Sequence, residues 1–560
     1  MTDTESLNRP RIILGERSNF LQDLLLDLQR AFLLIWMLLV TAVPLLLRRL
    51  VWIHDDPAVL GARLRQSFQR LGITYIKLGQ FLAMRFDLLP EEVCRELAGL
   101  FDNVPPMSSQ AIRQTLETEF SRPIDELFRD FDWQCIAAAS VAQVHKAMTQ
   151  DGRLAAVKIQ RPGISSIFTA DIRNFRRLAR MGDYLQLFGP QSIVEAVNEF
   201  ERYTLREMDF MIEGRTADRL RSNAGPGEDS PRVYWELTTT RVLTTELVEG
   251  YPLSEIIHFI ERGDKAGLER IAPGLDLQLA LRNFAWACMR QLFVTGFFHA
   301  DPHPGNIFLR QDGTVVFVDF GIFGQLTSER REIFASYIEN LAVGNVAQSY
   351  QHFVKLLQPT IQTDMLQLRR DVHQIMHRWH KASQETEATV SERHLGTYFS
   401  EFITAIRNNK IQMSMDTLLF WRAILTLDAT ALRFGGHFDL LGALREFFKE
   451  TRPTPLERLL SLSANQALAA SLLKLKQEAP QRLGTLVETL SRQRYQLSVL
   501  QSTTPFGEQA DGSTSLIVLA IIGGSVAMLL VKLPGVFGRA ILWVTMLSLA
   551  TAILIRLVRR

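Results

Sequence analysis

The sequence predicts an α+β protein, and three observations lead to that class. Short β-branched runs bounded by turn residues, which are typical of strands, gather between residues 136 and 250. Apolar residues at helical spacing dominate before this region, in 55–135, and after it, in 251–450. Long apolar runs lie near both ends of the chain. A region of strands followed by a region of helices is the pattern expected of α+β proteins.

Composition excludes several classes of protein. The 560 residues are 47% hydrophobic, which suffices for two to four folded units. Because 62 basic and 60 acidic side chains leave a net charge of +2, nothing suggests a nucleic-acid partner. The three cysteines lack CxxC spacing, so we expect neither a disulfide framework nor a zinc site. Acidic residues among the first thirty argue against a secretory signal or transit peptide and favour a bacterial cytoplasmic origin.

Three uncharged segments of sixteen residues each, 32–47, 516–531 and 540–555, are candidates for the membrane. Each would form a helix of about 24 Å, whereas the hydrocarbon core is about 30 Å thick, so flanking residues must help them span. Pro534 and Gly535 separate the last two, which predicts a helical hairpin; the alternative is a pair of buried core helices. The first segment contains a proline, and it can be an interfacial or re-entrant helix, a span or core.

The chemistry is concentrated in GFFHADPHPGNIFLRQDGTVVFVDFG, residues 296–321. Protein kinases present an HRDLxxxN sequence followed by DFG, and the chain offers Asp301, Asn306 and Asp319 at matching spacing. A hairpin over 307–318 would return Asp319 to Asn306. We therefore expect Asp301 to orient or deprotonate an acceptor, and Asn306 and Asp319 to hold Mg²⁺ beside ATP.

A rival interpretation uses the same segment as a metal centre. His299, Asp301 and His303 alternate along an extended loop and could converge on the zinc or manganese of a hydrolase. That interpretation leaves Lys158 and the DFG sequence unexplained.

Lys158 lies within the β-branched run AAVKI, where an unpaired ammonium would be costly to bury. In kinases the partners of such a lysine are the phosphates of the nucleotide and a glutamate from an adjoining helix. Here the helix after this strand offers Glu207, Asp209 and Glu213. No GxGxxG precedes Lys158. An alanine-rich stretch, 137–144, stands there instead, and because alanine lacks glycine's backbone freedom we expect the nucleotide to be held differently from a protein kinase.

At this point the chain resembles the UbiB (ADCK) family of atypical kinases, over roughly residues 60–450. Four motifs carry the resemblance: Lys77-Leu78-Gly79-Gln80 looks like the KxGQ signature, Ala137-Ala138-Ala139-Ser140 like the alanine-rich loop, Glu207-Met208-Asp209 like the ExD element, and His299 to Asn306 like the catalytic loop.

The resemblance implies a protein-kinase-like two-lobed fold whose KxGQ helices cross the mouth of the active site and restrict entry of a protein substrate. Lys77 would then be catalytic and, with Gly79, Gln80, Glu207 and Asp209, regulatory, since it faces the ExD pair. Glu213 would be the partner of Lys158. The residues implied to bind ATP are Ala137, Ala138, Ala139, Ser140, Val144, Lys158, Glu213, Glu246 and Val248, the last two from a hinge with Thr245 as gatekeeper.

The leading hypothesis is a magnesium-dependent ATPase or small-molecule kinase that supports ubiquinone or related isoprenoid-quinone biosynthesis. We expect it at the bacterial inner membrane with its kinase domain on the cytoplasmic face, and we expect as partners the lipid bilayer, an isoprenoid-quinone precursor or lipid, and other quinone-biosynthesis enzymes. The alternatives are a nucleotide-binding scaffold without turnover, such as a lipid-extracting chaperone, and a protein kinase proper.

Together these observations divide the chain as follows: an apolar, membrane-associated segment (1–54), a helical KxGQ extension (55–135), an N-lobe with inserted helices (136–250), a helical C-lobe with the catalytic loop (251–450), a helical extension (451–501), a linker (502–515) and a transmembrane hairpin (516–558).

Overall fold

The computed structural model divides into two compact units, Met1–Thr451 and Arg452–Arg560. It describes residues 24–34, 36, 56–86, 89–100, 106–139, 141–184, 193–359, 363–384, 394–435 and 438–452. The expected extension over 451–501, apart from its first two residues, the linker and the hairpin over 516–558 lie outside the described residues. Within the described ranges, every helix is too short or too polar to cross a membrane.

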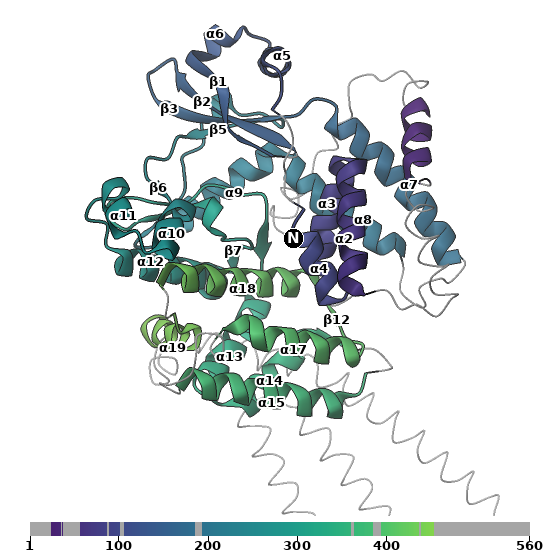
Figure 1. Ribbon diagram of the computed structural model, residues 1–560, viewed down its shortest axis with the longest axis vertical. Helices are drawn as coiled ribbons and strands as arrows, with labels where there is room; N and C mark the ends of the chain where they lie inside the picture. Colours follow the sequence, from purple (N-terminus) through teal and green to yellow (C-terminus); the bar gives the residue numbers. More distant parts are fainter. Residues whose placement is uncertain are drawn as a thin grey trace, which may run out of the picture. The chain divides into compact units, whose positions relative to one another are not determined.

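A four-stranded antiparallel sheet holds Lys158. Its order is β1 (Phe128–Ala138), β2 (Ala142–Thr149), β3 (Leu154–Gln160), β5 (Val242–Glu246). Along β3, Ala155, Val157 and Ile159 are fully buried on one face, where they pack in a cluster with α5 (Ser109–Phe120) and α6 (Ile124–Leu127), seen above the sheet in Figure 1. Because side chains alternate along a strand, Lys158 lies on the opposite face.

A second sheet positions the residues from the HADPHPGN and DFG sequences. Its order is β4 (Glu228–Asp229), β9 (Val315–Phe317), β8 (Ile307–Leu309), β6 (Tyr251–Pro252). Strands β8 and β9 form a hairpin in which Ile307 pairs with Phe317, and Gly313 takes a φ of 78° in its turn. Its open end is closed by Val318 N–H, which donates to Asn306 O at 3.0 Å. The flanking strands β7 (Phe297–His299) and β10 (Phe323–Gln325) pair separately.

The helices between residues 253 and 451 contain about half of the buried aromatic side chains, and most of these helices lie below β7 in Figure 1. Helix α18 (Met415–Gly435) contacts α12 (Leu277–Arg290), α10 (Leu253–Arg262), α17 (Leu395–Asn408) and β10. The others are α11 (Lys265–Ile271), α13 (Ser328–Ala342), α14 (Val346–Val354), α15 (Met365–Gln384) and α19 (Leu440–Thr451). Stacking of Phe334 on Phe420 at 3.9 Å joins α13 to α18. This core makes α18 a rigid platform beside the catalytic loop.

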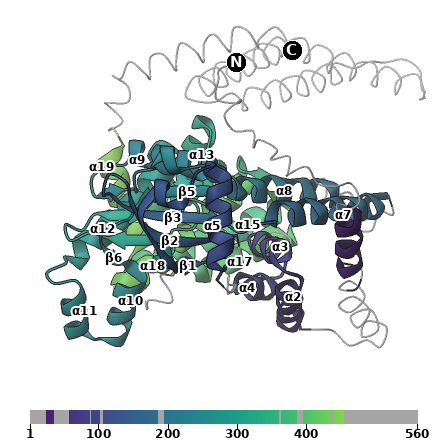
Figure 2. The same ribbon diagram turned by 90° about the horizontal axis from the view of Figure 1, so that it is seen from above.

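A separate group of helices lies to one side of both sheets, as Figures 1 and 2 show. It comprises α2 (Pro57–Leu71), α3 (Ile73–Ala83), α4 (Glu91–Ala98), α7 (Ile164–Tyr184) and α8 (Ile193–Met208). Helix α9 (Phe210–Asn223) follows α8 and contacts β5. A cluster that includes Phe68, Tyr75 and Leu97 holds α2, α3 and α4 together. These helices bring the KxGQ sequence, on α3, against the ExD sequence at the end of α8.

Candidate active site

Lys158 is paired in the way that the resemblance implies. Its Nζ lies 2.6 Å from Glu213 Oε1, on the first turn of α9, and 3.5 Å from Asp319 Oδ1. The Glu213 side chain is only 3% exposed. Burial disfavours the charged ammonium of Lys158 and would lower its pKa. The negative charges of Glu213 and Asp319 outweigh this effect, so the pKa of Lys158 is raised. Burial raises the pKa of Glu213, and the lysine opposes that shift. The lysine is therefore a fixed cation on an inner strand of the first sheet, on the face opposite α5.

The loop after β7 fixes Asp301 and Asn306 through its own backbone. Asp301 N–H donates to His299 Nδ1 at 3.0 Å, and Asn306 Nδ2 donates to Asp301 O at 3.3 Å. Because its nitrogen is engaged, the amide oxygen of Asn306 is left for another partner. Burial lowers the pKa of His299 to about 4, so its imidazole is neutral at neutral pH. His299 therefore acts as a buried support of the loop.

Asp319 provides the second carboxylate at the open end of the β8–β9 hairpin, and its side chain is 41% exposed. Burial would raise its pKa, but the charge of Lys158 prevails and the pKa of Asp319 is lowered. An ionised carboxylate and a free amide oxygen, brought together by one hairpin, are the oxygen ligands that Mg²⁺ prefers, and the ion also takes water and phosphate oxygens. Asn306 and Asp319 therefore fit a magnesium ion that accompanies a nucleotide.

Arg422, which the sequence did not suggest, contacts Asp301 directly. From the middle of α18, its Nη2 donates to Asp301 Oδ2 at 2.6 Å, with side-chain exposures of 28% and 20%. Burial disfavours the charge, but Asp301 raises the pKa of Arg422. Tyr203 of α8 lies among the same charges. Burial is the largest cause that raises the pKa of its phenol, and the negative charge of Glu207 is the next. No local pattern could have identified Arg422, because 121 residues separate it from Asp301.

The KxGQ and ExD residues form a cap over this side of the site. Lys77, 6% exposed on α3, donates to Glu207 Oε1 on α8. A Cβ on Gly321 of the DFG sequence would be 3.6 Å from Glu207 Cγ, so Glu207 lies against that sequence. Asp209 instead forms the N-cap of α9, where its Oδ1 accepts from Met211 N–H at 3.0 Å. The ExD element thus joins the cap to the helix that supplies Glu213.

Gly79 and Gln80 hold α3 against its neighbours. A Cβ on Gly79 would lie 2.2 Å from Leu100 Cδ1 and 2.8 Å from Phe68 Cδ2, so only glycine permits the present packing. Gln80 Nε2 donates to Leu100 O at 3.2 Å. The roles of these two residues in the KxGQ sequence are therefore structural: they fix the position from which Lys77 reaches Glu207.

The alanine-rich stretch forms a short connection between β1 and β2. Ala137 and Ala138 end β1, and Ala139 N–H donates to Ala142 O at 2.8 Å, which closes a tight turn. Ser140 lies outside the described residues. Val144 pairs in register with Lys158 on β3, and cross-strand neighbours face the same side of a sheet, so Val144 shares the face of Lys158. How a nucleotide meets this connection stays a prediction.

The hinge residues lie at the end of β5. Thr245 pairs with Ala156, and Glu246 N–H donates to Arg232 O at 2.8 Å. The Glu246 carboxylate accepts from Arg232 N–H at 3.2 Å, so its side chain is occupied. Val248, half-buried, follows in the segment that leads to β6. Any contact of Glu246 with adenine must therefore come from its backbone carbonyl.

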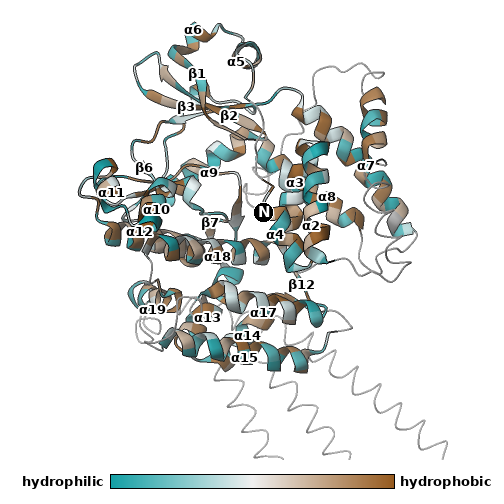
Figure 3. Ribbon diagram, viewed as in Figure 1, coloured by the Kyte–Doolittle hydropathy of each residue, from teal (hydrophilic) through white to brown (hydrophobic). Residues whose placement is uncertain are grey.

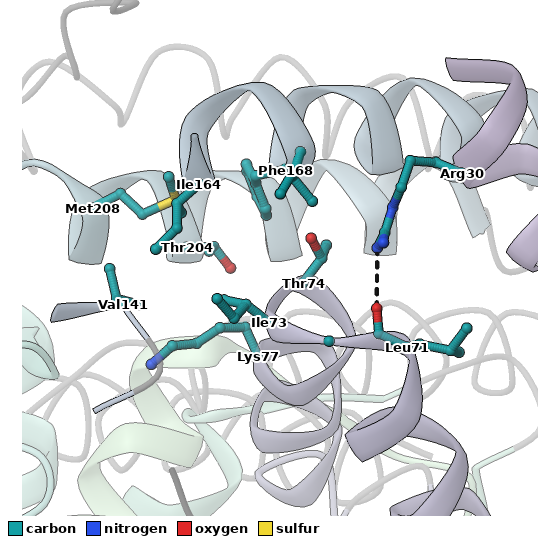
Figure 4. A pocket seen from close by; sticks show the side chains of 12 residues that line it. Arg30, Leu71, Ile73, Thr74, Lys77, Val141, Ile164, Phe168, Thr204 and Met208 are labelled. Carbon is teal, nitrogen blue, oxygen red and sulfur yellow. Dashed lines mark hydrogen bonds between the residues drawn. The ribbon is translucent and has the colours of Figure 1, made fainter. Parts of the chain in front are cut away.

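An apolar cavity adjoins the cap (Figure 4). Ile73, Val141, Ile164, Phe168, Thr204 and Met208 contribute to its wall. In Figure 4 Lys77 runs along one side and its ammonium points out of the cavity, while Arg30, hydrogen-bonded to Leu71 O at 3.3 Å, lies at the other end. This cavity lies behind the cap and is distinct from the charged group of Lys158, Asp301 and Asp319.

The metal-hydrolase interpretation finds no support in the geometry. His299 Nδ1 and His303 Nδ1 each accept a backbone hydrogen bond, from Asp301 N–H and Gly305 N–H respectively. Across the part of the chain that the structure describes, no group of three or more histidine, cysteine or acidic side chains is placed to hold a metal. Asp301 is engaged by Arg422 instead.

Comparison with known proteins supports the resemblance. Residues 99–353 match the model of the ABC1 atypical kinase-like domain. An uncharacterised Synechocystis protein, slr0889, is 30% identical over 365 residues, which cover 64% of this chain and 86% of slr0889. The chain belongs to the ABC1 (UbiB) family of atypical kinase-like proteins. Asp301, Asn306 and Asp319, with their kinase-like spacing, lie within the residues that match this kinase-like domain.

Two further members of the ABC1 family illustrate its range. The "Probable protein kinase UbiB" of Aeromonas hydrophila is 37% identical over 51% of this chain and 53% of its own length. "Protein ACTIVITY OF BC1 COMPLEX KINASE 7, chloroplastic" of Arabidopsis thaliana is 34% identical over 55% of this chain and 43% of its own length. The chain thus spans about half, or less, of these two relatives. The solved Rv3197–erythromycin complex of Mycobacterium tuberculosis aligns with 67% of this chain and 91% of its own, at 21% identity and a TM-score of 0.44.

Proposed function

We propose that this ABC1-family protein is a membrane-anchored ATPase or small-molecule kinase that uses Mg-ATP. The observation that carries the proposal is the convergence of three parts of the chain. The Nζ of Lys158, from the first sheet, lies within 3.5 Å of carboxylate oxygens of both Glu213, from α9, and Asp319, which follows the β8–β9 hairpin. Such a cation, held by a buried carboxylate beside the carboxylate of a DFG sequence, is the arrangement that grips nucleotide phosphates in kinases.

The remaining residues have complementary roles in phosphoryl transfer. Asn306 and Asp319 would hold Mg²⁺, which when bound neutralises charge on the phosphates. Asp301 would take the proton of the attacking water or hydroxyl. The oxygen of that water or hydroxyl then bonds to the terminal phosphorus, while the bond from this phosphorus to the departing ADP breaks. Arg422, 2.6 Å from Asp301, would keep that carboxylate oriented before it accepts the proton.

The cap favours a small acceptor over a polypeptide. Tyr203 lies among the charges of Glu207, Asp301 and Asp319, and Glu207 is held by Lys77, so packed helices carry these side chains close to Asp301. A rigid helical cap obstructs a polypeptide more than water or a small molecule. For the biological role we propose support of ubiquinone or related isoprenoid-quinone biosynthesis at the bacterial inner membrane, with residues 516–558 as the anchor and an isoprenoid-quinone precursor or lipid as the acceptor or effector. Family membership and the apolar segments of the sequence support this role.

The test is phosphate release by the purified full-length protein in detergent, with Mg-ATP and a quinone-precursor mimic such as an alkylphenol. Asp301→Asn and Asp319→Asn should lose most of the rate. Asp312→Asn is the matched control, because Asp312 lies in the exposed turn of the same hairpin, where it accepts from Thr314 N–H at 2.9 Å. An unchanged rate in Asp301→Asn would show that the catalytic assignment is wrong.

Two other outcomes would identify the alternatives. A nucleotide-dependent rise in melting temperature without any phosphate release would favour a nucleotide-binding scaffold or lipid-extracting chaperone. Labelled polypeptide from radioactive ATP would favour a protein kinase. Quinone content in a bacterial strain that lacks its own family member, complemented with the wild type or Asp319→Asn, tests the biosynthetic role separately from the chemistry.

A further inference from the structure

A helix over residues 24–34, here the N-terminal helix, packs along α7 by one face. Asp27, 7% exposed, accepts two hydrogen bonds from Arg173 Nε at 3.0 and 3.1 Å. Arg30 donates to both oxygens of Asp171, at 2.7 and 2.6 Å, and Asp171 is fully buried. Leu34 is 4% exposed on the same face. Buried ion pairs of this kind fix both the position and the rotation of the helix.

The opposite face of the N-terminal helix is apolar and uncovered among the described residues. Leu24, Leu28, Phe32 and Trp36, at intervals of four residues, are 44%, 59%, 67% and 58% exposed, and Leu25 beside them is 66% exposed. At about 100° per residue these five side chains fall within about 120° of the helix circumference, which makes one continuous stripe. Figure 3 shows the helix with its brown, apolar residues beside α7.

This stripe differs from the scattered apolar residues that every protein surface carries. Five large side chains adjoin one another, two of them aromatic, and contiguous patches of that size mark an interaction surface. Beyond Trp36 the sequence continues without a charge as MLLVTAVPLLL and reaches Arg48 and Arg49. A protein-binding patch in water is usually bounded by polar residues, whereas a lipid surface accepts both the stripe and its uncharged continuation.

The aromatic residues of the stripe fit the same partner. Tryptophan favours the boundary between headgroups and acyl chains, and Trp36 lies at the end of the stripe where the uncharged sequence begins. Arg173 and Arg177 of α7, with side chains 38% and 59% exposed, pair with Asp27 on the packed face of the helix. An acidic or neutral protein partner would require no such continuous apolar sequence.

We infer that the N-terminal helix lies in the plane of a lipid bilayer, with Leu24, Leu25, Leu28, Phe32 and Trp36 in the boundary between headgroups and acyl chains. The inference rests on the membrane location in the proposed function and adds a second contact, which fixes the orientation of the kinase-like body. Because Asp27 and Arg30 tie the helix to α7, the orientation of the helix in the bilayer also sets the orientation of α7.

The test uses the full-length protein in vesicles of phosphatidylethanolamine and phosphatidylglycerol. Leu28→Cys carries an environment-sensitive dye, and bromine-labelled lipid serves as the quencher. The control is Leu366→Cys on α15, 73% exposed and far from the N-terminal helix in sequence. The unsubstituted protein, treated with the same dye, gives the background from the natural cysteines. Phe32→Cys provides a second position if Leu28→Cys fails to fold.

Bromolipid should remove more than about half of the Leu28 dye signal, as expected of a helix at acyl-chain depth, and should leave the Leu366 signal unchanged. Equal quenching at the two positions would overturn the inference. A Leu28 dye shielded from both water and bromolipid would also overturn it, because protein would then cover the stripe. Protein that stays in the vesicles and hydrolyses ATP while the Leu28 dye remains in water would refute this contact alone. Loss of ATP hydrolysis or of vesicle retention would refute the proposed function instead.

Discussion

The pairing of Lys158 with Glu213 leads to a quantitative prediction for Lys158→Met. At 2.6 Å and an effective dielectric constant of about 20, the attraction is on the order of 6 kcal/mol, and desolvation of both groups offsets much of it. The variant leaves Glu213, 3% exposed, without its cation. Removing one partner of such a pair typically costs about 3–5 kcal/mol. For a body of about 400 residues, this cost lowers the melting temperature by roughly 4–6 °C.

The pH dependence of that loss has a definite sign. Burial raises the pKa of Glu213, and without Lys158 nothing opposes the shift. A carboxyl group with a raised pKa in the folded state costs stability as pH rises above its unfolded value of about 4.3, and the cost is complete above the folded pKa. The melting deficit of Lys158→Met should therefore be larger at pH 8 than at pH 5.

The assay is thermal unfolding of the full-length protein in detergent, at both pH values, for the wild type, Lys158→Met, Glu213→Gln and the double variant. A neutral amide needs no cation, so the double variant should recover most of the loss. The reasoning is refuted if Lys158→Met melts like the wild type at pH 8, or if adding Glu213→Gln recovers nothing.

Three other substitutions test particular contacts. Arg422→Met should lower the rate of phosphate release about tenfold, or ~1.4 kcal/mol, because Asp301 loses the cation 2.6 Å away. Arg422→Lys keeps a charge and should lose less of the rate. Rates measured under saturating Mg-ATP test this. Gly79→Ala should destabilise by about 1–3 kcal/mol, because its Cβ would lie 2.2 Å from Leu100 Cδ1, and an unchanged melting temperature would contradict the packing argument. Burial raises the pKa of Asp428 to about 7, so its ionisation costs stability progressively as pH rises from about 4, by about 1.5 kcal/mol at pH 5 and about 4 kcal/mol above pH 7. Asp428→Asn should therefore melt higher than the wild type at pH 8 and by a clearly smaller margin at pH 5, and an equal margin at the two pH values would argue against this.

The chemistry could be predicted from the sequence because its parts are local. Asp301 and Asn306 are five residues apart, and a hairpin short enough to be recognised from its turn brings Asp319 back to them. Lys158 follows the alternation of a strand, so its placement opposite a buried face was also predictable. The family signature supplied the cap residues, among which Lys77 meets Glu207 in the structure.

Only the tertiary structure decided which charges meet across long separations. By residue pattern alone Glu207, Asp209 and Glu213 were equal candidates, and the family resemblance implied Glu213 for Lys158 and the ExD pair for Lys77. The packing of α8 and α9 brings Glu207 to Lys77 and Glu213 to Lys158, and it makes Asp209 a helix cap.

Arg422 reaches Asp301 from a helix more than a hundred residues later, and which face of the N-terminal helix is covered depends on its ion pairs with α7. Local pattern fixes which groups a strand, turn or loop offers, because neighbours in sequence share backbone geometry. Which distant groups become partners depends on how helices pack, and that is a property of the whole core.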